Sequence, residues 1–459
     1  MAIEIDLKQY INTYGLHHIK VIATGEGFRN SEPTIAEYTS NPYITFSDAG
    51  IILTNVQVGV TSIDLYVDDV LEKTVTHDPT LTADVTIDFT GTSVTPTSLN
   101  KFKVTVHTSY GDFTSNEART TRVFGVSGMY DENVELTRTD DAIGKTFNID
   151  TSTGLVTSDF DNEFPYSEMT EVTIDDSVFI SIPEMWWRIG KDRKGNITDI
   201  AVGRYINSPG TWYKSDAFLV GKYLAGYENY KTVSKSGKTQ SNYYSIVQWT
   251  DYAKANGEGY KPYGAYEHTI LTFLWLIEFA NKRSVNIMKG YYNYNAYTGG
   301  TDSIPTVTGY ITSNDRMKYR GIEDFVGNRA VTLPDVTGEY YTSRDVETYK
   351  SGAENKTQLS YYKYLPKPAS YQWRVIEALG WDDNNPFICM PSKVGTATTS
   401  LTTYFGSSVY GPNGSNTTAP RAKLYTNYSN YCSLVSPMFD ISYTSTSSTN
   451  GSRLIKYEI

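Results

Sequence analysis

Cysteine and histidine are scarce in this sequence, and their scarcity narrows the chemistry that the chain can perform. Among 459 residues there are two cysteines, Cys389 and Cys432, and five histidines. Two cysteines are too few for a disulfide framework or a zinc module, so we expect buried or idle thiols. A Ser/His/Asp set, a phosphate-binding loop and an HExxH motif are also missing. The common catalytic patterns are therefore not present.

Positive charge is also in short supply. The chain has 40 basic and 51 acidic residues and a formal net charge of −11, with no cluster of Lys or Arg. Nucleic acids and anionic lipids are bound through a basic footprint. The composition therefore argues against both as partners.

Long apolar runs are absent as well. The start, MAIEIDLKQYINTYG, has no basic segment followed by an apolar one, so we expect no signal peptide. The most apolar run, 269–280, contains Glu278 and is far shorter than the ~20 residues of a membrane span. We therefore expect no membrane insertion.

Tyrosine, by contrast, is abundant, with 39 residues. A tyrosine offers a large rigid contact face and a hydroxyl, with little rotamer entropy to lose, which suits recognition surfaces. It also suits half-buried β-strands, so both explanations stay open. The length predicts two to four domains.

The first 125 residues read as β-structure. Residues 1–40 contain two strand-like runs, 17–24 and 34–38, joined by the turn-rich GEGFRNSEP, and we interpret them as an attachment segment with a β-hairpin. Residues 41–125 alternate apolar and polar residues between Gly, Pro, Asp and Asn turns, which predicts an immunoglobulin-like β-sandwich. A spacer and a carbohydrate-binding or adhesive module are both compatible with this fold.

Two helices stand out in the remaining stretch, 126–459. YYSIVQWTDYAKA (243–255) places Ile246, Trp249, Tyr252 and Ala253 on one stripe, with a stop at Asn256–Gly257. EHTILTFLWLIEFANK (267–282) is apolar almost all round, which predicts a central buried helix. The rest reads as short strands and ordered loops.

This C-terminal stretch resembles the C-type lectin-like, formylglycine-generating-enzyme-like domain at the end of phage tail proteins, which some targets of diversity-generating retroelements share. The segments that carry the resemblance, in order, are LTRTDDAIG (136–144), SDFDNEFPYSEM (158–169), VFISIPEMWWRIG (178–190), DAFLVGKYLAGY (216–227), SKSGKTQS (234–241), YAKANGEGYKPY (252–263), ILTFLWLIEFANKRSVNIMKGY (270–291), YRGIEDFVGN (319–328), LGWDDNNPFICMPSKVG (379–395) and NGSRL (450–454). The resemblance implies a loop-rich lectin-like fold with two main helices. Together with the sandwich predicted for 41–125, this makes the expected fold class α+β.

Several residues in these segments are expected to be scaffold. Gly321 and Gly327 permit left-handed turns, Arg320 and Glu323 can pair with each other, and Asn328 can cap backbone.

Two further sets are assigned to the scaffold. Trp186 and Trp187 follow Pro183 and are expected to pack in the core, with a sugar-stacking platform as the alternative. Arg453 is expected to end the last strand with an ion pair or backbone contacts.

The resemblance also raises the question of catalysis. Formylglycine-generating enzymes oxidise with a C-terminal cysteine pair, whereas residues 421–453 contain only Cys432. His268 is expected at a helix end, and Asp175–Asp176 and Asp382–Asp383 are expected to be solvated. WDDNNP (381–386) has oxygen donors suited to Ca²⁺ but is interpreted as a turn. We therefore expect no enzyme, no metal and no cofactor.

The last part of the chain is the expected contact surface. Residues 396–452 contain only three charged residues, Arg421, Lys423 and Asp440, among Ser, Thr, Asn, Gly and Tyr. Apolar residues within it predict anchoring strands that hold exposed loops. The expected receptor-binding residues are Tyr425, Asn427, Tyr428, Asn430, Tyr431 and Tyr443. Alternatively, this cluster covers the end of the fold or lies in a trimer interface.

Together these observations predict a phage virion protein, a tail-fibre or receptor-binding tip that contacts a host-surface glycan or protein. Its expected partners are that receptor and other tail or baseplate proteins, and a trimer is expected because linked weak contacts gain avidity. It would assemble in the host cytoplasm and act at the host surface. The alternatives are a baseplate or capsid-decoration protein without receptor contact, and a cellular adhesin or retroelement target.

Overall fold

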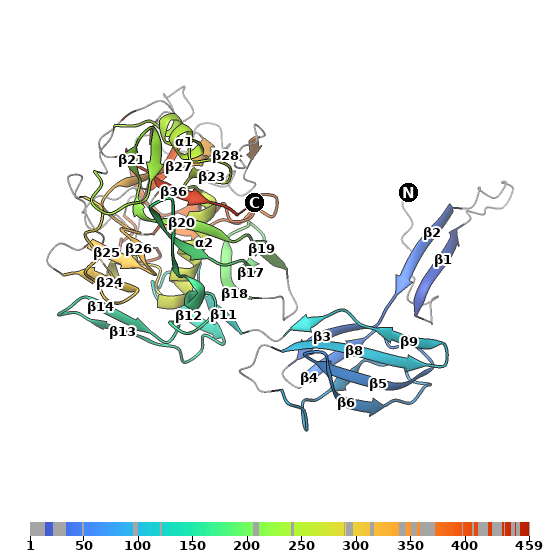
Figure 1. The fold of residues 1–459 in the computed structure, drawn as a ribbon. Helices are drawn as coiled ribbons and strands as arrows, with labels where there is room; N and C mark the ends of the chain where they lie inside the picture. Colours follow the sequence, from blue (N-terminus) through green and yellow to red (C-terminus); the bar gives the residue numbers. More distant parts are fainter. Residues whose placement is uncertain are drawn as a thin grey trace. The chain divides into compact units, whose positions relative to one another are not determined.

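The structure is a computed structural model. It describes residues 14–21, 34–47, 50–94, 100–119, 122–204, 211–239, 243–288, 290, 297–312, 316–338, 346–349, 356–358, 372–396, 398–405, 408–411, 421–424, 434–435, 437–441, 446 and 450–458. The chain divides into two compact units. The first reaches Thr121, and the second comprises Arg122–Arg204 and Thr211–Ile459 (Figure 1).

The first unit consists of a hairpin followed by two sheets that enclose one apolar core. Its strands are β1 (Gly15–Val21), β2 (Thr34–Ser40), β3 (Tyr43–Ser47), β4 (Gly50–Thr54), β5 (Val60–Val67), β6 (Val70–Thr76), β7 (Val85–Ile87), β8 (Lys101–Thr108), β9 (Gly111–Thr114) and β10 (Ala118–Arg119). β1 pairs with β2, one sheet has the order β10-β8-β5-β6 with β9 beside β8, and the other has the order β3-β4-β7. The two strand runs predicted within residues 1–40 are thus present as an antiparallel hairpin.

Alternation along the strands builds this core. Ile63, Leu65 and Val67 of β5 and Val104 and Val106 of β8 are buried, and the residues between them are more exposed. Successive side chains of a strand point to opposite faces. The alternating pattern in the sequence therefore identified the buried face correctly.

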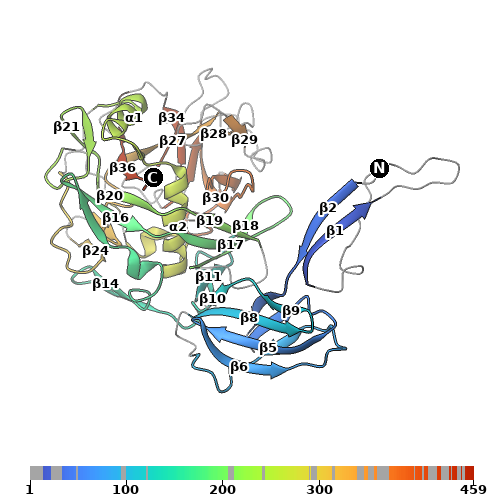
Figure 2. The ribbon, with the colours of Figure 1, turned by 45° about the vertical axis from the view of Figure 1, so that its right-hand side comes forward.

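The second unit is also mostly β-structure, in several sheets. One has the order β12-β11-β18-β17-β19, a second β15-β16-β20-β36-β23, a third β13-β14-β24-β25-β26, and a nine-stranded sheet has the path β29-β28-β27-β33-β34-β32-β30-β31 with β35 beside β27; β21 and β22 form a separate hairpin. Figure 2 shows these strands around the helix α2.

The bounds of these strands are β11 (Val123–Ser127), β12 (Thr137–Asp140), β13 (Phe147–Asp150), β14 (Leu155–Ser158), β15 (Glu171–Ile174), β16 (Ser177–Ile182), β17 (Met185–Lys191), β18 (Ile197–Gly203), β19 (Trp212–Ser215), β20 (Phe218–Leu224), β21 (Gly226–Glu228), β22 (Lys231–Val233), β23 (Tyr260–Pro262), β24 (Thr308–Ile311), β25 (Arg316–Tyr319), β26 (Ile322–Glu323), β27 (Ala330–Gly338), β28 (Val346–Tyr349), β29 (Lys356–Gln358), β30 (Gln372–Leu379), β31 (Pro391–Val394), β32 (Ser408–Gly411), β33 (Arg421–Leu424), β34 (Pro437–Ile441), β35 (Asn450–Gly451) and β36 (Arg453–Lys456).

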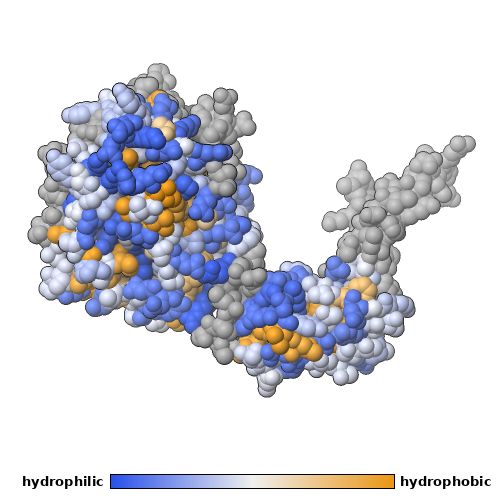
Figure 3. All heavy atoms as spheres, viewed as in Figure 1, coloured by the Kyte–Doolittle hydropathy of each residue, from blue (hydrophilic) through white to orange (hydrophobic). Residues whose placement is uncertain are grey.

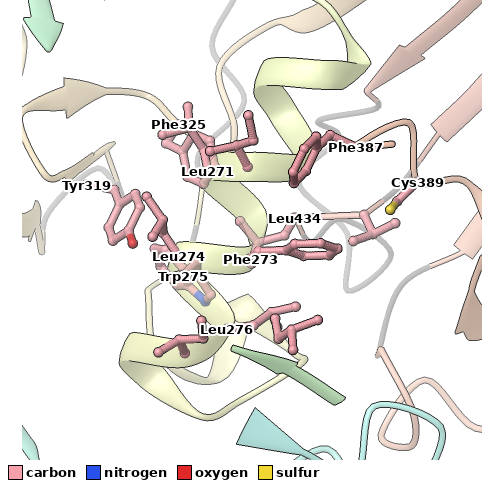
Figure 4. Close-up of a cluster of buried hydrophobic side chains, with 14 of the residues drawn as sticks. Leu271, Phe273, Leu274, Trp275, Leu276, Tyr319, Phe325, Phe387, Cys389 and Leu434 are labelled. Atoms are coloured by element: carbon pink, nitrogen blue, oxygen red, sulfur yellow. The ribbon is translucent and has the colours of Figure 1, made fainter. Parts of the chain in front are cut away.

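The helix α2 (Ala265–Phe279) is the buried centre of the second unit. Its apolar side chains project on several sides toward residues such as Tyr319, Phe325 and Phe387, so it is covered all round, as its composition predicted (Figure 4). The predicted span 267–282 ran too far, because Ala280 is left-handed with φ 46° and ends the helix.

The N-terminus of α2 is capped from a distant strand. One Asp335 oxygen accepts from the Ala265 amide at 2.7 Å and the other from the Tyr266 amide at 3.2 Å, while a Glu267 oxygen accepts from the Gly264 amide at 2.9 Å. These carboxylates satisfy amides that have no acceptor within the helix. Gly264 is needed here, since a Cβ at this position would lie 2.4 Å from an Asp335 oxygen.

The helix α1 (Ile246–Lys254) is shorter than the predicted 243–255. It begins after Ser245, which forms a capping box with Gln248. Ile246, Trp249 and Ala253 are buried, whereas Tyr252 of the predicted stripe is only half-buried. The helix thus presents a tyrosine at the margin of its buried face.

In β17, strand alternation separates the two tryptophans. Trp187 is fully buried, and its indole Nε1 donates to Ser215 Oγ at 3.0 Å. Trp186 points to the other face and is half-buried. The expectation that both indoles pack in the core therefore fails for Trp186.

Candidate functional site

The predicted contact residues Tyr425, Asn427, Tyr428, Asn430, Tyr431 and Tyr443 lie outside the described residues. The strands on either side of them are described. β33 and β34 pair antiparallel, with Leu424 opposite Pro437 and Arg421 opposite Ile441. The chain segment that carries the first five residues therefore starts and returns at one end of this ladder.

Tyr443 stands apart from the other five in this topology. β34 ends at Ile441, opposite Arg421, which is the other end of the ladder from Leu424. The chain then comes back to β35, where Asn450 and Gly451 lie beside Ala330 and Val331 of β27. The two tyrosine-bearing connections thus leave the sheet at opposite ends, which the sequence alone did not indicate.

A contact from α2 fixes the return of the first connection. Leu434 and Val435 are buried, and the Leu434 carbonyl lies 2.6 Å from His268 Nε2. His268 Nδ1 lies 3.0 Å from the Tyr263 hydroxyl. Burial lowers the pKa of His268 to about 4, so the ring is neutral near pH 7, with Nε2–H donating and Nδ1 accepting. His268 thus lies in the first turn of α2, at a helix end as expected from the sequence, and serves there as a buried anchor.

A buried ionic network supports the loops between Thr301 and Asn328. Arg320 binds Glu278 of α2 through two nitrogens, Nε at 3.0 Å and Nη2, and its Nη1 lies 2.7 Å from Asp161. The expected pairing of Arg320 with Glu323 is therefore wrong. Arg320 is left-handed, with φ 47°, at the turn into Gly321, and this turn directs the two side chains to different partners.

Glu323 pairs with Arg316 instead. Arg316 Nη2 lies 2.8 Å from Glu323 and 2.5 Å from Asp324, and Asn328 Nδ2 donates to Asp324 at 2.7 Å. Glu323 also accepts from the Thr301 amide and hydroxyl, both at 2.8 Å. Burial raises the pKa of Glu323, although Arg316 and these donors oppose the shift. Asn328 thus bonds a carboxylate and not the exposed backbone that we expected.

Arg453 completes the network at the start of the last strand. Its Nη1 donates to the Gly221 and Lys222 carbonyls at 2.7 and 3.0 Å, and its Nη2 to the Glu323 carbonyl at 2.7 Å. These are the backbone contacts expected for Arg453, although it begins β36 and does not end it. Gly321 and Gly327 have φ values of 82° and 105°, in the left-handed region that favours glycine.

The groups considered for catalysis have different surroundings. Cys389 is buried, and burial raises the pKa of its thiol, which disfavours the reactive thiolate. Cys432 lies outside the described residues. Asp382 is buried, so the expectation of a solvated carboxylate fails for it. Asp383 is exposed as expected, and it accepts from Lys191, Tyr213 and the Trp381 indole. Asp175 and Asp176 form the exposed turn between β15 and β16.

Within the described ranges, no group of three or more His, Cys, Asp or Glu side chains is placed to hold a metal ion. The same part of the chain contains no helix with the length and apolarity needed to cross a membrane.

The sequence did not single out a second tyrosine cluster, formed by β21, β22 and α1. Tyr227 contacts Tyr244 and Tyr252, each with ring centroids 4.9 Å apart, and Tyr230 at 6.2 Å. On the face of the molecule shown in Figure 3, hydrophilic residues predominate and hydrophobic residues form separate patches. The high density of tyrosine between 223 and 252 was the signal available in the sequence.

Comparisons with known proteins give weak structural similarity only. No family model matches the chain, and no curated protein matches it. Among solved structures, it is similar to "Major Tropism Determinant P3c Variant" with TM-score 0.25 and to "Major Tropism Determinant U1 Variant" with TM-score 0.24. Each has 10% sequence identity, and each match covers 83% of this chain and 91% of that chain. At these TM-scores the similarity assigns neither a fold nor a function.

Proposed function

We propose that this chain is a non-catalytic phage receptor-binding protein that contacts a host-surface glycan or protein through the connection between β33 and β34. One observation carries the proposal. A segment with Tyr425, Asn427, Tyr428, Asn430 and Tyr431 starts and returns on paired strands, and its return is held by a buried His268–Leu434 bond. Tyrosine and asparagine on a fixed frame combine rigid aromatic contact with adaptable hydrogen bonding.

The resemblance of residues 128–454 to lectin-like domains of phage tail proteins supports the same proposal. It also leads us to propose the lectin-like fold for the second unit, an immunoglobulin-like sandwich that spaces it, and a virion location with a tail or baseplate protein as neighbour. A trimer is proposed because weak contacts gain avidity when linked. The buried thiol of Cys389 and the neutral, hydrogen-bonded His268 support the absence of catalysis.

The test is binding of the fluorescently labelled full chain to a panel of bacterial strains. The variant Tyr425→Ala/Tyr428→Ala/Tyr431→Ala should lose at least about tenfold in apparent affinity, since a few aromatic anchors carry most interface energy. The matched control replaces three tyrosines that are exposed elsewhere, Tyr43, Tyr110 and Tyr297, by alanine. If both folded variants bind the same strains equally well, the contact surface is elsewhere, as it would be in a purely structural virion component.

A further inference from the structure

Two exposed tyrosines at the tyrosine cluster of β21, β22 and α1 have a left-handed backbone: Tyr230, a member of the cluster, and Tyr243, the residue before its member Tyr244. Tyr230 is 76% exposed with φ 62°, and Tyr243 is 63% exposed with φ 49°. A bulky residue rarely adopts the left-handed region, and doing so costs free energy. A strained backbone that holds a tyrosine largely in solvent suggests a functional role for these two side chains.

Tyr230 lies in a tight turn whose backbone conformation favours glycine. It is the second residue of the two-residue turn between β21 and β22, after Asn229 with φ 48°. Turns of this kind need positive φ at both positions and strongly prefer Asn-Gly. Here a tyrosine occupies the place of the glycine. The chain thus holds an aromatic ring in solvent at the tip of a hairpin, where a glycine would be the more stable choice.

The support under the cluster is rigid. Tyr244 packs edge-on against the buried Trp249, with ring centroids 5.2 Å apart. Asn256 Nδ2 at the end of α1 donates to the Thr232 carbonyl of β22 at 2.9 Å. Glu228 accepts from Lys235 and Lys238, both at 2.7 Å. Hairpin and helix are therefore held together, and the rings are positioned before any ligand arrives.

The exposed polar groups around the rings are of mixed kind. Asn229 and Lys231 of the β21–β22 hairpin and Asp251 and Lys254 of α1, the elements that carry the cluster, are exposed. They supply hydrogen-bond donors and acceptors next to aromatic faces and tyrosine hydroxyls. A pyranose ring has the same combination, an apolar C–H face bordered by hydroxyls that both donate and accept. The lysines at this rim also disfavour a cationic partner.

We infer that this cluster is a second binding surface, for a saccharide, with Tyr230 and Tyr243 as its exposed stacking residues. It consists of other residues than the β33–β34 connection, and it does not depend on the function proposed for that connection. A saccharide ring stacks on these tyrosines and bonds to Asn229, Lys231, Asp251 and Lys254.

The test is electrophoresis of the full chain in native gels that contain dextran, mannan, galactan, glycol chitin or alginate. Retardation is expected with at least one polysaccharide, and Tyr230→Ser/Tyr243→Ser should weaken the apparent affinity about tenfold. Tyr110→Ser is the matched control, because Tyr110 is 78% exposed at a turn of the first unit. The Tyr425, Tyr428 and Tyr431 variant should be retarded as strongly as the parent chain, which separates this inference from the proposed function.

A second variant guards against misfolding. Tyr230→Gly should raise the Tm because it relieves the turn, and yet it should weaken the retardation. The inference is overturned if none of the five polysaccharides retards the chain. Retardation that is unchanged in the double variant, or lowered equally by Tyr110→Ser, overturns it as well.

Discussion

The cores of the two units satisfy their polar groups in different ways. Among the described residues of the first unit, the buried polar side chains are Ser40, Gln57 and Asn100, and the core around them is apolar. The second unit buries many charged side chains, among them Lys282, Arg320 and Arg453. The first unit is built largely from regular ladders, which pair their own backbone groups.

Loops explain the buried charge of the second unit. Lys282 Nζ donates to the Gly128 and Asp131 carbonyls at 3.1 and 2.6 Å, and Arg138 donates to the Ile277 and Glu278 carbonyls at the end of α2 at 2.5 and 2.6 Å. Burial lowers the pKa of Lys282 to about 8. Buried backbone carbonyls that are not paired in a sheet need another hydrogen-bond donor. In the irregular buried segments of the second unit, charged side chains donate these hydrogen bonds.

The largest effect is expected from breaking the central ion pair of the second unit. Arg320→Met leaves the Glu278 carboxylate buried without its main cation, which should cost about 3–5 kcal/mol of unfolding free energy. Denaturant unfolding should show the loss in the transition of the second unit. The control Lys73→Met breaks an exposed pair with Asp88 in the first unit and should cost much less, because water screens an exposed pair. Similar losses for the two variants would contradict the contrast between the cores.

A slightly smaller effect is expected from a cavity in the first unit. Leu65 is fully buried in β5, and Leu65→Ala should cost about 3 kcal/mol through lost burial and the remaining cavity. This loss should appear in the unfolding transition of the first unit. Far-UV circular dichroism measures that transition with a signal that does not depend on tryptophan. A change confined to the second unit's transition would show that the two units do not have separate cores.

The next effect depends on pH. The pKa of His268 is about 4 in the folded chain and about 6.5 when unfolded, so the unfolded state binds more protons between these values. Stability should therefore fall as the pH drops through this window, by about 2 kcal/mol between pH 7.5 and pH 5. His268→Gln should remove this part of the pH dependence in urea titrations. If the stability of the variant depends on pH as strongly as that of the parent chain, then other groups cause the pH dependence.

The smallest expected effect is an increase in the free energy of unfolding. Tyr230→Gly should raise the unfolding free energy by about 1 kcal/mol, because glycine adopts positive φ without steric cost. Thermal unfolding of the variant and the parent measures this difference. The reference is Asn229→Gly, since asparagine already tolerates the left-handed region and less gain is expected there. An equal or larger gain from Asn229→Gly would show that the backbone strain is not greater at Tyr230 than at Asn229.

The sequence predicted what depends on local pattern. The alternation in 41–125 identified strands, and the apolar composition of 267–282 identified a buried helix. The two glycines 321 and 327 are left-handed as expected.

Contacts between distant parts of the chain could not be predicted. Asp335 caps a helix that begins 70 residues earlier, and Arg320 pairs with Glu278, 42 residues before it. Arg320 was assigned to Glu323 because that carboxylate is near in sequence. Helical spacing predicts that Tyr252 belongs to the buried stripe of α1. In the structure Tyr252 lies at the margin of that stripe and contacts Tyr227 and Tyr244, which the spacing does not indicate.

The proposed function requires that the β33–β34 connection contacts the receptor while the buried His268–Leu434 bond holds its return. Amide hydrogen exchange of the full chain, with and without envelope fragments from a strain that it binds, tests this claim directly. The account predicts slower exchange in peptides that cover residues 425–433, with the peptides of β5 and β8 unchanged. Protection that is confined to other peptides, with residues 425–433 exchanging as in the free chain, would contradict it.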